Sequence, residues 1–265
     1  MSSSFKSSVH VTFIGTATAI LEVDGINFLT DPFFSPLGTE WDLGILTLKN
    51  SYEPPLGLQD LPVIDAVFLS HEDHPDNLDE IGRRLLDGRR VLTTNEGAAN
   101  LAPRPGVRGL KPWETVPLNI GGRHFEVTAT PCKHAPVGEC IGFVLSAAEF
   151  GSTNGLPNAI YFSGDTVYIE ELAEIGKRFH ISLALVNLGS AAMPISDPPL
   201  QITMDGEQAV RLVREINADL MIPMHFEGWG HFTEGRDALK KVFGKEDIND
   251  KVRWLAPGER QQILG

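Results

Sequence analysis

The chain has 265 residues, of which 42% are hydrophobic, and a formal net charge of −13 at pH 7. This length suits one large domain or two halves that share a core, and the composition is that of a globular protein. The acidic charge argues against nucleic acid or an anionic membrane as the main partner, although a bound metal ion can still attract an anionic substrate.

No stretch has the features of a targeting or membrane segment. Residues 1–10 lack an apolar core, and no apolar run is long enough for a membrane span. The two cysteines, Cys132 and Cys140, are expected to be free thiols in a reducing compartment. We therefore expect a cytoplasmic protein in which residues 1–265 form one domain, with a flexible tail over 1–8. The sequence leaves open whether the chain forms a homo-oligomer.

The first third of the chain predicts strands followed by a long loop. Residues 9–15 are expected to form a strand, and 18–31 a hairpin whose turn is Asp24-Gly25, a pair that tolerates positive φ. The Pro- and Gly-rich stretch 32–57 has no periodicity and is expected to be a loop. Its aromatic residues suit either a pocket wall or packing against the core.

The rest of the chain alternates strands and helices, which predicts a layered α/β fold with two sheets. An apolar strand over 65–70 leads to a helix that starts near Leu78 and that Asn77 could cap. Two later helices are expected to be capped by Thr203 and Thr233. Further strands are predicted at 91–94, 107–110, 124–131, 140–147, 159–166, 181–189, 220–226 and 251–259, and helices at 169–179, 203–217 and 234–243.

Several apolar strands end in a side chain that can bind a metal. His71, His134, Asp165 and His225 each follow such a strand closely. In layered α/β proteins, ligand sites form where strand ends and their loops converge. If these ends share one edge, the imidazoles and carboxylates together suit zinc, manganese or ferrous iron.

Four motifs in series resemble the metallo-β-lactamase superfamily: "LSHEDHPDN", "TPCKH", "FSGDT" and "PMHFEGW". The opening "FIGTATAILEVDGINFLTDP" is similar to the branch that contains ascorbate-phosphate lactonases and N-acyl-phosphatidylethanolamine phospholipase D. The resemblance covers about Val9 to Pro257. It implies a four-layer αββα sandwich with one or two divalent metal ions at an edge of the two sheets, most simply Zn²⁺, with Mn²⁺ or Fe²⁺ as alternatives.

The first motif departs from the family pattern H-x-H-x-D-H. One register inserts a residue and uses His71, His74, Asp76 and Asn77, with Asn in place of the last histidine. The other uses His71, Asp73 and His74. We favour the first, because the first histidine of the family follows its strand after Ser or Thr, as in "LSH".

The resemblance then assigns His71, His74 and His134 to metal one, and Asp76 and His225 to metal two, with Asp165 bridging. Asn77 becomes either a weak ligand or a helix cap without metal contact, because a neutral carbonyl oxygen is a poor zinc ligand.

Other residues near the motifs have two readings each. Asp31 could accept a hydrogen bond from a ligating histidine, or only hold its turn. His231 could orient substrate and stabilise an oxyanion, or it could serve packing. Trp229 is expected in a pocket wall.

The resemblance implies a metal-dependent hydrolase in which metal-activated water opens a lactone or lactam bond of a small molecule. Asp76 or Asp165 would accept the proton, and His231 would be a donor to the oxyanion. A small-molecule phosphodiesterase is one alternative, which the lack of an Arg/Lys cluster near the motifs disfavours. A degenerate, non-catalytic metal-binding module is the other, because of Asn77.

Overall fold

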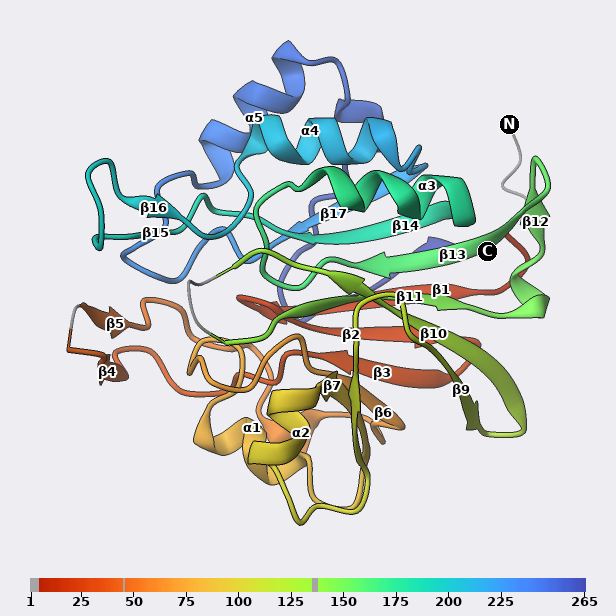
Figure 1. The fold of residues 1–265 in the computed structure, drawn as a ribbon, viewed down its shortest axis with the longest axis horizontal. Coiled ribbons are helices and arrows are strands. Elements are labelled where there is room, and N and C mark those ends of the chain that lie inside the picture. The colour runs from red at the N-terminus through yellow and green to blue at the C-terminus, as the bar shows by residue number, and fades with distance from the viewer. Residues whose placement is uncertain (1–4, 45, 135–137) are drawn as a thin grey trace.

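The computed structural model describes residues 5–44, 46–134 and 138–265. Two large β-sheets face each other, and helices cover the outer face of each, so that the order of layers is α, β, β, α (Figure 1). This arrangement confirms the four-layer sandwich expected from the sequence.

The first sheet combines antiparallel and parallel strands. Its N-terminal strands pair antiparallel, and from β3 onward the neighbours pair in parallel. The Asp24-Gly25 turn has positive φ at both residues, as its sequence predicts. In spatial order the strands are β18 (Arg260–Leu264), β1 (Val9–Gly15), β2 (Thr18–Val23), β3 (Ile26–Thr30), β6 (Ala66–Phe68), β7 (Arg90–Thr94) and β8 (Val107–Leu110).

The second sheet places several strand ends at one edge. Its order is β17 (Leu220–Met224), β14 (His180–Asn187), β13 (Leu156–Phe162), β11 (Ile141–Ser146), β10 (Arg123–Pro131) and β9 (Thr115–Ile120), with the short β12 (Ser152–Thr153) beside β13. The pairings β17–β14 and β14–β13 are parallel, and β13–β11 and β11–β10 are antiparallel. Strands β10, β13, β14 and β17 therefore run in one direction and end at the same edge.

The helical layers differ in size. Helices α1 (Glu80–Leu85) and α2 (Asn95–Asn100) lie on the first sheet, and α3 (Ile175–Arg178), α4 (Gly206–Glu215) and α5 (Arg236–Lys245) lie on the second (Figure 1). Short 3₁₀ turns complete the fold: η1 (Leu58–Asp60), η2 (Ala148–Phe150), η3 (Glu170–Glu174) and η4 (Asn249–Lys251).

Alternation along the strands divides the core between the layers. On β6, Phe68 points between the sheets, whereas Val67 packs in the cluster under α1 and α2. On β14, Leu183 and Leu185 face the other sheet, and Ala184 packs with the helices of the second layer. Both strands read as continuous apolar runs because both of their faces are buried.

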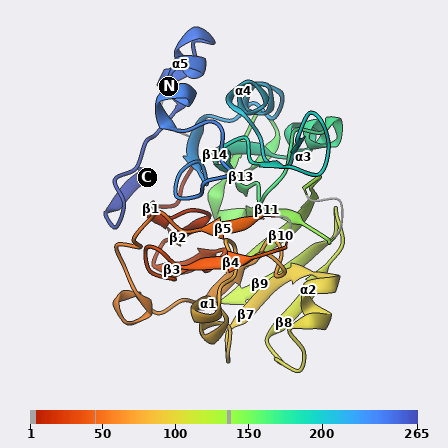
Figure 2. The same cartoon turned by 90° about the vertical axis from the view of Figure 1, so that its left-hand side faces the viewer.

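Two hairpins extend from the edge at which the strands end. Strands β4 (Glu40–Asp42) and β5 (Thr47–Lys49) form one, and β15 (Ala192–Met193) and β16 (Leu200–Gln201) form the other. Figure 1 shows both on the same side of the molecule, and Figure 2 views the first from that side. The prediction of a structureless loop over 32–57 was therefore wrong for its central part.

The predicted helix caps were also wrong. Asp79, and not Asn77, caps α1 by accepting a hydrogen bond from the Gly82 amide. Asp205 caps α4, while the hydroxyl of Thr203 accepts a hydrogen bond from Ala191. Helix α5 follows Gly235 without a side-chain cap, since the Thr233 hydroxyl donates to the carbonyl of Ser190.

Three further predictions needed correction. The closing strand is β18 and not 251–259, where Val252 makes only an isolated bridge to Met221. The predicted helix 169–179 divides into η3 and the single turn α3. Residues 1–4 of the predicted tail lie outside the described residues, whereas Phe5 is buried and packs against Phe150 with ring centroids 4.7 Å apart.

Candidate metal centre

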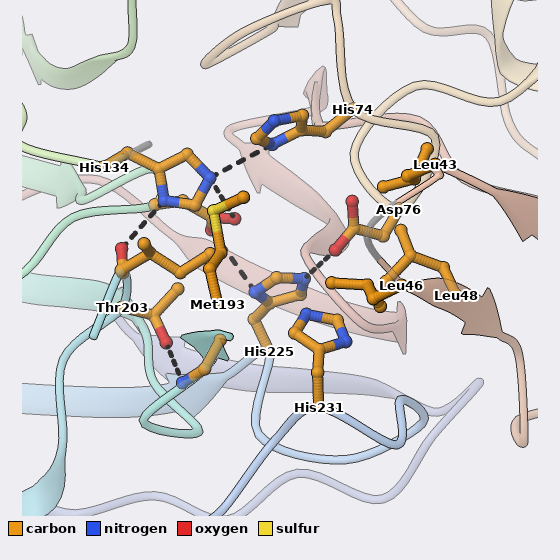
Figure 3. A pocket seen from close by; sticks show the side chains of 13 residues that line it. Leu43, Leu46, Leu48, His74, Asp76, His134, Met193, Thr203, His225 and His231 are labelled. Atoms are coloured by element: carbon orange, nitrogen blue, oxygen red, sulfur yellow. Dashed lines mark hydrogen bonds and ion pairs between the residues drawn. The ribbon is translucent and has the colours of Figure 1, made fainter. Parts of the chain in front are cut away.

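The candidate metal ligands gather where strands of both sheets end. His71 follows β6 of the first sheet, and His74 and Asp76 lie in the loop after it. From the second sheet, His134 follows β10, Asp165 follows β13 and His225 directly follows β17. Because β10, β13 and β17 end at one edge, these side chains converge although they are far apart in sequence. Figure 3 shows His74, Asp76, His134 and His225 around one pocket.

Three imidazoles form the first group. Nδ1 of His74 lies 3.0 Å from Nε2 of His71 and 3.1 Å from Nε2 of His134. One nitrogen of each ring lies within 4.8 Å of the others, a spacing that could hold a metal ion. Asp73 is exposed on the surface instead. The structure thus brings together the residues of the favoured register, with His74 and not Asp73 in the group.

The outer hydrogen bonds of two of these rings define which nitrogen carries a lone pair. Nδ1 of His134 lies 2.8 Å from the carbonyl oxygen of Ile202, which can only accept, so Nδ1 is the protonated nitrogen. The Ser70 hydroxyl donates to Oδ2 of Asp31 at 2.8 Å and therefore accepts from Nδ1 of His71, also at 2.8 Å. In both neutral rings Nε2 is then unprotonated and faces the group.

This arrangement fits a cation. Unprotonated nitrogens that face one another within about 3 Å repel unless a proton or a metal ion lies between them. Ligating histidines also commonly donate their second ring nitrogen to a carbonyl or carboxylate, as His134 does directly and His71 does through Ser70. Asp31 therefore accepts no hydrogen bond from any described histidine and is linked to His71 only through the Ser70 hydroxyl.

Two carboxylates and an imidazole form the second group. Nδ1 of His225 lies 3.3 Å from Oδ1 of Asp165, and its Nε2 lies 3.7 Å from Oδ2 of Asp76. Oδ2 of Asp165 lies 3.9 Å from Nε2 of His134, so Asp165 lies between the two groups. All of these side chains are buried, and both nitrogens of His225 are without a hydrogen-bond partner among the described residues. An unsatisfied buried imidazole beside two carboxylates is also the environment of a metal ligand.

Two hydrogen bonds fix the positions of Asp165 and His225. Nδ2 of Asn187, at the end of β14, donates to Oδ1 of Asp165 over 2.7 Å. The backbone N–H of His225 donates to the carbonyl of Thr16 at 2.9 Å, and His225 has a φ of 54°. This left-handed backbone is uncommon for a residue with a side chain and turns the chain sharply after β17.

Asn77 is fully buried beside the second group. Its Nδ2 donates to Oδ2 of Asp31 at 3.0 Å, and its Oδ1 has no hydrogen-bond partner among the described residues. The cap of α1 is Asp79, so the helix-cap reading of Asn77 is wrong. Its reading as a weak metal ligand stays a prediction.

Burial and neighbouring charge shift the protonation of the centre in opposite directions. Burial, assisted by the other imidazoles, holds the pKa of His71 well below its usual range and lowers that of His134. Burial also opposes the imidazolium of His225, but the carboxylates of Asp165 and Asp76 outweigh it and raise that pKa.

The pKa values of the carboxylates Asp165 and Asp31 are also shifted in opposite directions. Burial opposes the charged form of Asp165, yet His225, His134 and His71 hold its pKa well below the usual range. Burial raises the pKa of Asp31 to about 7, in spite of its hydrogen bonds to Ser70 and Asn77. Asp165 is therefore the permanent negative charge at the middle of the centre.

A small cavity opens above the candidate metal ligands, with walls that are largely apolar. Leu43, Leu46 and Leu48 come from the β4–β5 hairpin, and Met193 comes from β15 (Figure 3). None of the described residues that line it is a lysine or an arginine.

His231 is part of this lining, and its Nδ1 has no partner among the described residues. Trp229 was expected in the wall but lies behind it. It packs in one cluster with Phe33 and Leu48, with its ring 5.8 Å from that of Trp41. The loop aromatics therefore support the hairpin from beneath.

Sequence reasoning missed Asn187, Ser70 and the leucines of the hairpin. Asn187 ends an apolar strand as the candidate ligands do, so its position was a usable signal.

No described helix is long and apolar enough to cross a membrane.

Comparisons with known proteins identify relatives over almost the whole chain. A family profile described as "Beta-lactamase superfamily domain" matches residues 26–226. An uncharacterized protein of Mycobacterium tuberculosis is 28% identical, and the alignment covers 98% of this chain and 70% of the relative. A protein of Caldivirga maquilingensis named as a metal-dependent hydrolase is 25% identical, with 94% of this chain and 96% of the relative covered.

Solved structures share the fold. The isothiocyanate hydrolase from Delia radicum gut bacteria aligns with a TM-score of 0.78 at 23% identity, over 97% of this chain and all of that protein. Igni18, a metallo hydrolase from Ignicoccus hospitalis, aligns with a TM-score of 0.73 at 21% identity, over 97% of this chain and 99% of its own. Likenesses at these identities establish the architecture and leave the substrate open.

Proposed function

The chain belongs to the β-lactamase superfamily, and on this premise we propose that it is a metal-dependent hydrolase that opens a lactone or lactam bond in a small neutral molecule. The observation that carries the proposal is the gathering of four imidazoles and two carboxylates at the floor of an apolar cavity. Zinc is the first candidate metal, because imidazole with carboxylate is a common zinc ligand set.

The chain's own side chains divide the work. His71, His74 and His134 would hold one cation, and Asp76 with His225 a second, with Asp165 between them. Cations in such a centre supply Lewis-acid polarisation and a lower pKa for water. The buried carboxylates of Asp76 and Asp165 face this centre. Asp76 would take up a proton from the attacking water, and Asp165, whose carboxylate stays charged, would orient that water.

His231 is the proposed donor to the developing oxyanion. It lies in the cavity wall beside His225, and burial lowers its pKa, so the ring is neutral at pH 7. A neutral imidazole still carries one N–H, which can donate to an oxygen that becomes negative during the reaction.

The cavity favours a neutral substrate. Its walls consist largely of leucine and methionine side chains. Apart from the candidate metal ligands and His231, none of its described lining residues has a side chain that could carry a positive charge and pair with a phosphate. Apolar walls with a few polar groups at the floor suit a small hydrophobic ester or amide. The same features disfavour the phosphodiesterase alternative.

The test is metal content together with a substrate panel. Protein purified without chelators or a histidine tag is expected to carry one or two equivalents of metal. It should turn over uncharged lactones or lactams faster than bis-nitrophenyl phosphate. An isothiocyanate belongs in the panel as another small neutral electrophile, given the fold shared with the isothiocyanate hydrolase.

Variants connect turnover to the site. Asp165→Ala and His225→Ala should each lose both metal and turnover, whereas Asp73→Ala, in the same loop but exposed, should keep both. Faster cleavage of the phosphodiester would favour the alternative substrate class. Protein without metal or turnover, and without rescue by added zinc or manganese, would favour a non-catalytic module.

A further inference from the structure

The two cysteines of the chain occupy facing positions at the end of one hairpin. The last residue pair between β10 and β11 is Pro131 with Ile141. Cys132 and Cys140 are the next residue on each side, just beyond the last pair of the ladder. Opposite residues in an antiparallel ladder have Cα atoms roughly 4.5–5.5 Å apart, which lies inside the range that a disulfide spans.

The thiols converge on one short segment. Sγ of Cys132 donates to the carbonyl of Ser163 at 3.3 Å, and Sγ of Cys140 donates to the carbonyl of Asp165 at 3.2 Å. These carbonyls are separated by Gly164 alone, and Cys132 is a direct side-chain neighbour of the Cys140 thiol. Both cysteines are free, and each is partly exposed as a residue.

The pair also borders the candidate metal centre without belonging to it. The connection between the two cysteines carries His134, and Cys140 Sγ lies 3.7 Å from Nδ1 of His71, the nitrogen that faces away from the three-histidine group. The two thiol donors therefore hold the segment of Asp165 against the hairpin that carries His134.

We propose that Cys132 and Cys140 are an oxidisable pair, and that their conversion to a disulfide weakens metal retention by the centre. A disulfide has no S–H, so the carbonyls of Ser163 and Asp165 lose both donors, and the sulfurs must turn toward each other. Loss of contacts just outside the ligands of a metal site commonly costs about 10-fold or more in affinity. This consequence rests on the proposed metal centre, whereas formation of the disulfide does not.

The oxidant named here is hydrogen peroxide. One sulfur attacks a peroxide oxygen, the O–O bond breaks, and a sulfenic acid and one water form. The second sulfur then attacks the first, the S–O bond breaks, and a second water leaves. Two thiols and one peroxide thus give one disulfide and two waters, with both electrons taken from sulfur.

The sequence provides a direct readout of the bond. Lys133 lies between the cysteines, and trypsin therefore separates them into peptides 124–133 and 134–177. After peroxide treatment, removal of the peroxide and alkylation of free thiols, the expected product is one species that joins these two peptides. It should disappear after reduction with a phosphine. Two separately alkylated peptides, or sulfinic acids in place of the link, would overturn the pairing.

The consequence is tested with zinc-loaded protein and a coloured zinc chelator. Peroxide should make zinc release about 10-fold faster, and phosphine should reverse the effect. Cys132→Ser and Cys140→Ser keep a hydroxyl donor for each carbonyl, and both should release zinc at the unoxidised rate with or without peroxide. Equal acceleration in these variants, or a linked species that releases zinc no faster, would overturn the proposal.

The two proposals can fail separately. If the protein retains no zinc under any condition, the proposed function fails while the linked peptide still reports on the thiol pair. If zinc is retained and lactones are hydrolysed but no link forms, only the redox proposal fails.

Discussion

Asn187 holds Asp165 through a hydrogen bond of 2.7 Å from Nδ2 to Oδ1, and both side chains are buried. Asp165 lies between the two groups of candidate ligands, so its orientation affects both. Asn187→Leu removes the donor with little change of volume. We expect about 10- to 100-fold weaker metal binding, measured by competition with a chelator. The exposed Asn249→Ala is the matched control, and equal affinity in both variants would show that Asp165 needs no partner.

The departure of Asn77 from the family pattern predicts a weak second site. Asn77→His restores the imidazole that the family motif has at this position. We expect the second equivalent of zinc to bind more tightly than in the unchanged protein. Titration of metal-free protein with zinc measures this affinity. The larger side chain also fills a fully buried position and should cost about 1–3 kcal/mol of stability without metal. An unchanged second affinity in a folded variant would mean that this position does not contact the metal.

Proton release should differ between the two metals. At pH 6.5, the ordinary imidazole value, His71 and His134 are mostly neutral because their pKa values are lowered, and they have few protons to lose. His225 has a raised pKa and is mostly protonated, so a metal must displace its proton. Calorimetric titration in two buffers of different ionisation enthalpy should therefore show more proton release for the second equivalent. The reverse order would contradict the assignment of the two groups.

His231 should affect turnover without affecting metal. His231→Ala removes the proposed oxyanion donor, and we expect kcat to fall by about 10²–10³ with metal content unchanged. His231→Gln retains an N–H donor and should recover part of the loss. A variant that loses metal along with activity would show that His231 supports the centre and is not an oxyanion donor.

Leu46 tests whether the apolar wall selects neutral substrates. It lines the cavity from the β4–β5 hairpin and is partly exposed, so a longer side chain can be accommodated. Leu46→Lys places a cation beside the candidate metal ligands. We expect kcat/KM for bis-nitrophenyl phosphate to rise relative to that for a neutral lactone. Leu46→Met is the control of similar length without charge, and an equal ratio in the two variants would exclude the wall from selection.

Four residues of the centre were predictable because each closely follows an apolar strand: His71, His134, Asp165 and His225. His74 and Asp76 were assigned from the family resemblance. The strands could be recognised from their apolar composition. Strands that run in the same direction in a sheet end at the same edge, which places these residues together. The pattern of strands and helices predicted a layered α/β fold with two sheets, and the four-layer order came from the family resemblance. His74 and Asp73 could not be separated by sequence alone, because both have suitable donors and only the path of the loop brings His74 to the other histidines.

The structure differs from the sequence predictions where tertiary contacts decide. Thr203 and Thr233 have the side chains of helix caps, but their hydroxyls bond to Ala191 and Ser190 instead. The closing strand β18 contains polar residues and pairs at the sheet edge with β1, whereas the more apolar stretch before it packs without a ladder. The hairpin β4–β5 consists of strands too short to show alternation.

The division of the ligands between the two sheets links metal binding to the stability of the fold. His71, His74 and Asp76 belong to loops of the first sheet, and His134, Asp165 and His225 to the second, so an unfolded chain does not present this set. A cation that binds only the folded chain adds about 4 kcal/mol to the free energy of unfolding when present at a thousand times its Kd. The metal would then act as a cross-link between the two halves of the sandwich, and the candidate centre would hold the two sheets together at the edge where their strands end.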